Sequence, residues 1–159
     1  MTNNKVNSKL NVVQFISAST SSVIGATTII PYDDSIPQNT EGTEVLTLAI
    51  TPKSATSTLE IVFTCAAEPD AVTANFYMLA LFQDSTADAL AAGVYTGSAN
   101  HSLLGILRYI MTSGTTSSTT FKIRAGPSTA GSVYVNGTSA GAATMGGVQI
   151  ALLTITEYL

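Results

Sequence analysis

One serine lies in a pattern that could carry nucleophilic chemistry. Residues 137–141 read Gly-Thr-Ser-Ala-Gly, which matches the G-x-S-x-G nucleophile elbow. In such an elbow the serine follows a strand and precedes a helix, and the activating histidine comes later in the chain. Here a glycine-rich stretch follows Ser139, and the single histidine, His101, comes before it. The match is expected by chance in a chain rich in Gly and Ser, so the sequence predicts no catalytic role for Ser139.

Four carboxylates close together in the sequence could gather around a metal ion. Carboxylate oxygens are the ligands that calcium prefers, but the known calcium loop needs D-x-D-x-D-G spacing. That spacing is missing among Asp33, Asp34, Glu41 and Glu44. Turn formation and solubility are therefore the preferred interpretation, and an ion near Asp33 and Asp34 is the alternative. His101 cannot form a metal site alone.

The single cysteine, Cys65, excludes an intrachain disulfide and any C-x-x-C metal or redox site. It is predicted to be a small buried hydrophobe on a strand. Walker A and Rossmann fingerprints are missing too, so no cofactor is expected.

Two further functions need residues that the sequence supplies sparingly. A polysaccharide hydrolase needs two carboxylates facing each other across a cleft, and the ten acids here lie mostly in turns. A receptor-binding protein that recognises host-surface glycan is better supported, by hydroxyl-rich loops at residues 112–120 and 128–132. Those loops lack aromatic rings that could stack on sugars. The chain is predicted not to be an enzyme.

Composition narrows the class of protein further. The length of 159 residues fits one domain. Charged residues make up only 10%, against a usual figure of about 25%. Six Lys plus Arg in an acidic chain cannot build the basic surface that nucleic acid requires. No stretch of about 18 apolar residues is present, so no membrane insertion is expected. The N-terminus has no apolar signal-peptide core. The protein is therefore predicted to be made in a cytoplasm and to leave it only when the cell lyses.

The chain divides into a short arm and a domain. Residues 1–10 are polar, with two positive charges and no acid, and add no periodic apolar residues to a core. They are predicted to be an N-terminal anchoring arm, with the candidate contact residues Asn3, Asn4, Lys5 and Lys9. Residues 11–159 form the predicted knob domain.

The domain reads as short strands separated by clusters of turn-forming residues. Alternation is clearest at residues 59–65, where every second residue is apolar. Residues 85–92 could instead form a short helix, although a hairpin loop running into a strand is preferred. The whole predicts an all-β fold, an antiparallel β-sandwich of jelly-roll type. The expected strands are 13–18, 23–30, 45–50, 59–65, 75–82, 103–111, 121–125, 133–135 and 148–159.

Residues 103–111 and 148–159 are nearly apolar on both faces, and one strand, at residues 76–82, is fully so. A two-layer sandwich leaves one face of each sheet in water, so both faces of this strand must be covered. Other copies of the chain are the simplest cover, and loops of the same chain are the alternative. The residues of this strand are therefore candidates for the subunit interface or the core: Phe76, Met78 and Phe82 on one face, and Tyr77, Leu79 and Leu81 on the other.

Several segments together resemble a known family. Residues 29–42, 80–90, 112–126 and 154–157 are similar, in order and spacing, to structural domains of tailed bacteriophages at fibre tips and other virion appendages. The resemblance extends over residues 14–157. It implies a homotrimeric jelly-roll knob, comparable in shape to tumour-necrosis-factor and C1q-like heads, with no catalytic residues.

The resemblance also implies a location and partners. A knob on the virion surface is expected, as a decoration protein, head fibre or fibre tip. Only the ten-residue arm precedes the domain, in place of a fibre shaft, which favours direct attachment to the capsid. The arm would bind the major capsid protein or a tail or baseplate protein.

Overall fold

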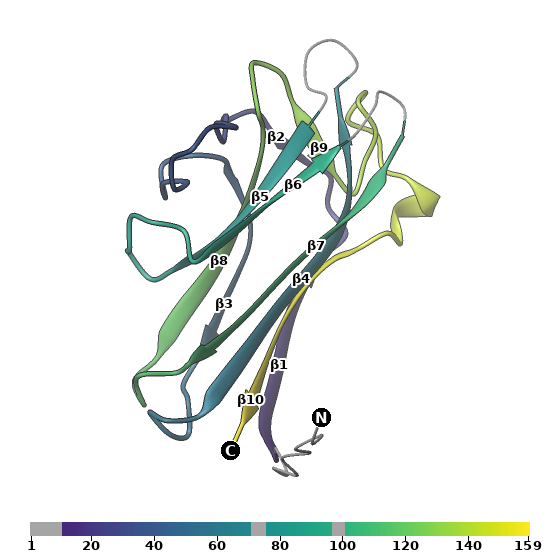
Figure 1. Cartoon of the computed structure of the whole chain (residues 1–159). Coiled ribbons are helices and arrows are strands. Elements are labelled where there is room, and N and C mark those ends of the chain that lie inside the picture. The colour runs from purple at the N-terminus through teal and green to yellow at the C-terminus, as the bar shows by residue number, and fades with distance from the viewer. Residues whose placement is uncertain (1–10, 71–75, 97–100) are drawn as a thin grey trace, which may run out of the picture.

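The computed structural model describes residues 11–70, 76–96 and 101–159. Two antiparallel sheets pack face to face, with ten strands and one short 3-10 turn, η1 (Met145–Gly147), in the described residues (Figure 1). The strands are β1 (Val12–Thr20), β2 (Ile24–Ala26), β3 (Thr43–Ile50), β4 (Thr58–Pro69), β5 (Phe76–Gln83), β6 (Ala91–Thr96), β7 (Leu103–Thr112), β8 (Thr119–Pro127), β9 (Val133–Val135) and β10 (Ala151–Tyr158).

The strand order is that of a jelly roll. The first sheet runs β1-β10-β4, with β7 on the other edge of β4. The short β9 pairs with the last residues of β4, and β2 pairs with β9. The second sheet runs β3-β8-β5-β6. Without β2 and β9, the eight remaining strands in chain order give 1-8-3-6 in one sheet and 2-7-4-5 in the other. First pairs with last and second with seventh, as in a long hairpin wrapped into a sandwich. The expected fold class is confirmed.

The main core lies between the two sheets. In β4 every second side chain is buried, from Leu59 through Phe63 to Cys65. These side chains meet Phe121 and Ile123 of β8 across the interior. Burial raises the pKa of Cys65 to about 12, which leaves its thiol protonated and unreactive. The structure thus buries Cys65 on a strand, as predicted.

Both faces of β5 are buried within one chain. Tyr77, Leu79 and Leu81 point into the sandwich core. Met78, Ala80 and Phe82 join Ile30 in a second core on the opposite side of the sheet, with Phe76 and Ala89 packed against it. The leading expectation, that other copies cover the second face, is therefore corrected. Loops of the same chain cover it.

Two connections are held together to make this cover. The β2–β3 connection contains Ile30, and the β5–β6 connection contains Ala89. Gln38 and Asp88 form a bridge between them, and the Asn39 N–H donates to the Ala87 carbonyl at 2.8 Å. Because these two connections cover β5, two element boundaries differ from or settle the expectations from the sequence. Strand β2 ends at Ala26, short of the expected residue 30. Residues 85–92 form no helix and run as a loop into β6 at Ala91, as preferred from the sequence.

Candidate functional site

The side of the first sheet that faces away from the sandwich is not covered by the described residues. The register sets its side chains in rows across four strands. Phe15, Thr156, Glu60 and Ile110 form one row, and Ser19, Leu152, Thr64 and Ile106 form another. We call this surface the outer face. It consists of Phe15, Ser17 and Ser19 of β1, Glu60, Val62 and Thr64 of β4, Leu104, Ile106, Arg108 and Ile110 of β7, and Leu152, Thr154, Thr156 and Tyr158 of β10.

Large apolar side chains are exposed on the outer face. The exposed fractions are 61% for Phe15, 64% for Leu104, 50% for Ile106 and 53% for Ile110. Strands β1 and β7 carry them, on either side of β10 and β4. Single exposed apolar residues are ordinary on a protein surface, but several on one sheet face mark an interaction site. The outer face is therefore the candidate functional site.

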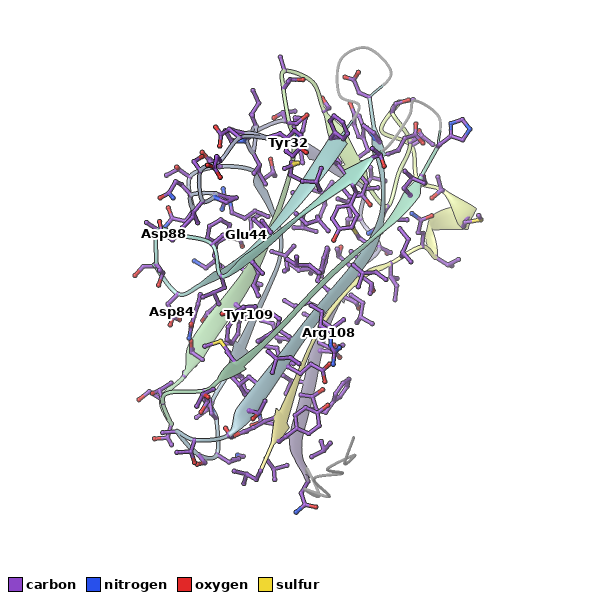
Figure 2. The ribbon with its side chains drawn as sticks, viewed as in Figure 1. Tyr32, Glu44, Asp84, Asp88, Arg108 and Tyr109 are labelled. Carbon is purple, nitrogen blue, oxygen red and sulfur yellow. The ribbon has the colours of Figure 1, made fainter. Side chains whose placement is uncertain are left out.

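A polar network lies in the middle of this apolar surface. Arg108 donates from Nε to Glu60 Oε1 at 2.6 Å, and its Nη2 lies 2.5 Å from the same oxygen. The Tyr158 hydroxyl donates to the other oxygen, Glu60 Oε2, at 2.7 Å. We call these three residues the Glu60 network. Arg108 points away from the sandwich, whereas its neighbour Tyr109 lies on the opposite side of β7 (Figure 2).

The hydrogen bonds of the network shift the pKa values of two of its members, Glu60 and Tyr158. The hydrogen bonds from Tyr158 and then from Arg108 hold the pKa of Glu60 below its ordinary value. The hydrogen bond to Glu60 raises the pKa of Tyr158, because the hydroxyl proton is shared with a carboxylate. The network therefore favours the ionised form of the Glu60 carboxyl and the neutral form of the Tyr158 phenol.

The structure places Ser139 away from elbow geometry. Its own N–H donates to Glu68 Oε1 at 2.9 Å, and the N–H of Ala140 donates to Thr138 Oγ1 at 3.3 Å. The second of these N–H groups would form part of an oxyanion hole in a true elbow. The described chain after Ser139 turns through η1 into β10 without an α-helix.

The candidate metal-binding carboxylates serve turns and an ion pair. Asp33 Oδ1 accepts hydrogen bonds from the Ser35 hydroxyl at 2.5 Å and from the Ser35 N–H at 2.8 Å, and these two bonds hold the pKa of Asp33 below its ordinary value. Glu41 accepts from the Gln38 N–H at 2.9 Å, while Glu44 lies 4.0 Å from Arg124. In residues 11–70, 76–96 and 101–159, no three His, Cys, Asp or Glu side chains are grouped to hold a metal ion.

The predicted arm lies outside the described residues, with its candidates Asn3, Asn4, Lys5 and Lys9. His101 begins the described segment directly before β7. No helix among the described residues is long and apolar enough to cross a membrane.

Two features were missed by reasoning from the sequence. One is the extent of the outer face: the sequence assigned the subunit contact mainly to residues 76–82, with help from 103–111 and 148–159, and did not include β1. The other is an aromatic pair next to the acidic loop, in which the ring centroid of exposed Tyr32 lies 5.6 Å from that of half-buried Phe76. Tyr32 is far in the sequence from the hydroxyl-rich loops at 112–120 and 128–132, and only the fold brings it next to Phe76.

Comparison with known proteins gives one family match. Residues 16–159 match the family model described as Pgp3 C-terminal domain. No curated protein sequence is significantly similar to the chain.

Three solved structures show distant likeness. The Eiger TNF of S. frugiperda is 11% identical with a TM-score of 0.43, over 92% of its length and 90% of this chain. The EclA C-terminal domain, a sugar-binding protein, is 14% identical with a TM-score of 0.38, over 83% of its length and 84% of this chain. The dimeric latent PorU of Porphyromonas gingivalis is 10% identical with a TM-score of 0.40; 92% of this chain matches only 13% of PorU. These scores are low, and the strand order itself identifies the jelly roll.

Proposed function

The chain belongs to the Pgp3 C-terminal domain family, and we propose that it is a non-catalytic structural domain that assembles with two further copies into a trimeric knob. The outer face carries this proposal. Water contacts Phe15, Leu104, Ile106 and Ile110 in the isolated chain. Burying a large apolar side chain contributes about 1.5–3 kcal/mol, so covering several of them in each copy favours association.

Self-association suits the charges of the outer face as well as its apolar area. Its one acid and one base are already paired within the chain, so two copies can approach without opposing like charges. The resemblance to trimeric phage domains and tumour-necrosis-factor-like heads supports a threefold arrangement.

We propose further that the knob is displayed on a phage virion, with residues 1–10 bound to the major capsid protein or to a tail or baseplate protein. The arrangement of the chain ends supports this. Asn11 and Leu159 exchange two backbone hydrogen bonds of 2.9 Å, so β1 begins where β10 ends. The β8–β9 connection lies at the far end of the sandwich (Figure 1). Attachment through the arm would therefore leave that end free for contacts outside the particle.

Two measurements test this proposal. Light scattering of the purified chain over a range of micromolar concentrations is expected to give three chain masses, and one chain mass throughout would contradict the trimer.

Gold-labelled antibody against the knob is expected to decorate intact particles of the source phage at regular positions. Particles that carry no label, from a preparation in which the chain is expressed, would contradict the virion location.

A second candidate function is recognition of host-surface glycan, and Tyr32 favours it. Its ring is 64% exposed beside Phe76, and Asp33 and Asp34 follow it in the same loop. An exposed aromatic ring with nearby carboxylates can stack on a sugar and accept hydrogen bonds from its hydroxyls. Binding of the knob to host envelope polysaccharide that is lost in Tyr32→Ala would support this function. Equal binding by Tyr32→Ala would exclude Tyr32 as the sugar platform.

A further inference from the structure

The Glu60 network lies where a purely apolar contact would be expected. Phe15 and Ile110 share its row across the sheet, and Val62 lies opposite Arg108. The Glu60 side chain is 18% exposed, whereas that of Arg108 is 61% exposed. The carboxylate is therefore held against the sheet, and the guanidinium is the part that a docking surface would meet.

No other charge in the described part of the four strands competes with this pair. The residues of β1 are uncharged. On β10, Glu157 points into the sandwich and accepts the Lys53 N–H at 2.7 Å. On β4, Glu68 is buried and accepts from Ser139. On β7, Tyr109 lies on the inner side. Any copy that docks on the outer face thus meets one charged pair in an otherwise neutral surface.

Burial of this pair has two energetic consequences. A buried ion pair contributes little to affinity against apolar residues of the same size, because both charges lose their water. Removing one partner is costly, because the other charge then stays buried alone. A single polar element inside an apolar interface therefore penalises every arrangement that leaves it without partners, which selects one geometry of association.

We infer that the Glu60 network is buried at the contact between copies and selects the trimer over other assemblies of the same apolar face. This inference rests on the proposed trimer. Its residues have distinct roles: Arg108 meets the neighbouring copy, while Glu60 and Tyr158 hold the guanidinium in position. The apolar side chains supply affinity, and the network supplies the choice of arrangement.

Two variants test the inference by sedimentation velocity at pH 7. Glu60→Gln removes the charge that balances Arg108, so the concentration at which half the trimer dissociates should rise by about 100-fold or more. The double variant Glu60→Met with Arg108→Met makes the face wholly apolar. It should associate at least as tightly as the wild type, but as a mixture of dimers, trimers and larger species.

Glu44→Gln is the matched control, because Glu44 pairs with Arg124 on the second sheet at 4.0 Å. It should sediment as the wild-type trimer does, and far-ultraviolet circular dichroism should show that all variants are folded. Assembly of Glu60→Gln as tight as that of the wild type would overturn the inference and leave the trimer standing. A double variant that forms trimers alone would also overturn it. A wild type that stays monomeric would instead contradict the proposed function and assign the outer face to a different partner.

Discussion

At the scale of single residues, hydrogen bonds decide which polar groups are available for chemistry. The N–H of Ala140 donates to Thr138, so the group that an elbow would turn toward an oxyanion is engaged inside the loop. Replacing Ser139 with Ala is therefore expected to leave any hydrolysis of ester or peptide substrates unchanged from a background rate. A wild-type rate above background that disappears in Ser139→Ala, measured with chromogenic esters, would contradict the non-catalytic account.

The Glu60 carboxylate gives a second prediction at this scale. Its pKa is lowered in the folded chain by the Tyr158 and Arg108 hydrogen bonds, so its contribution to stability is fully present above its ordinary pKa of 4.5. That contribution is lost as the pH falls through the lower, folded-state pKa. The melting temperature of the wild type should therefore fall more steeply below about pH 4.5 than that of Glu60→Gln. Glu44→Gln serves as the control for losing one carboxylate, and identical acid profiles of wild type and Glu60→Gln would refute the role of the network.

At the scale of elements, β5 shows why a strand is easier to recognise from the sequence than the segments that pack against it. The apolar run at 76–82 predicted a strand with two covered faces, and the structure has both faces covered. Periodicity describes the strand alone, however. Ile30 was expected at the end of a strand over residues 23–30, and it contacts β5 from the β2–β3 connection instead. The apolar run at 103–111 was predicted to help form the subunit contact, but its union with β1 was not. The side chains of β1 and β7 become one surface only after β10 and β4 are placed between them. The alternation in β4 needed no such partner and was predictable from the sequence.

Truncations in β5 test this assignment of both faces to one chain. Leu81→Ala and Phe82→Ala should each lower the free energy of unfolding by about 2–5 kcal/mol, because each leaves a cavity in a core. Neither loss should depend on protein concentration, since both cores lie within one subunit. The measurement is chemical denaturation at two protein concentrations tenfold apart. If the loss of unfolding free energy for either variant grows on dilution, that face of β5 contributes to the contact between subunits.

At the scale of the whole molecule, we propose an attachment end at the N-terminal arm, an association face on the first sheet and a free end opposite the arm. Deleting residues 1–10 should leave the knob folded and trimeric, because the described fold from residue 11 onward contains both cores. The truncated chain should fail to join virions when it is supplied in place of the full chain. Quantitative mass spectrometry of purified particles measures this incorporation. Truncated protein present at the normal copy number would show that residues 1–10 do not attach the knob to the virion.

The central claim is that copies of the chain associate through the outer face of the first sheet, and a comparison of two variants tests it. Ile106→Asp places a carboxylate among the exposed apolar side chains of the outer face, whereas Val94→Asp places one at a comparably exposed apolar position on the second sheet. Burying an unpaired charge between subunits is costly, so the first variant should stay folded but lose the trimer. Sedimentation equilibrium at micromolar concentration is expected to give one chain mass for Ile106→Asp and three for both Val94→Asp and the wild type. Three chain masses for Ile106→Asp would show that the outer face of the first sheet is not where the copies meet.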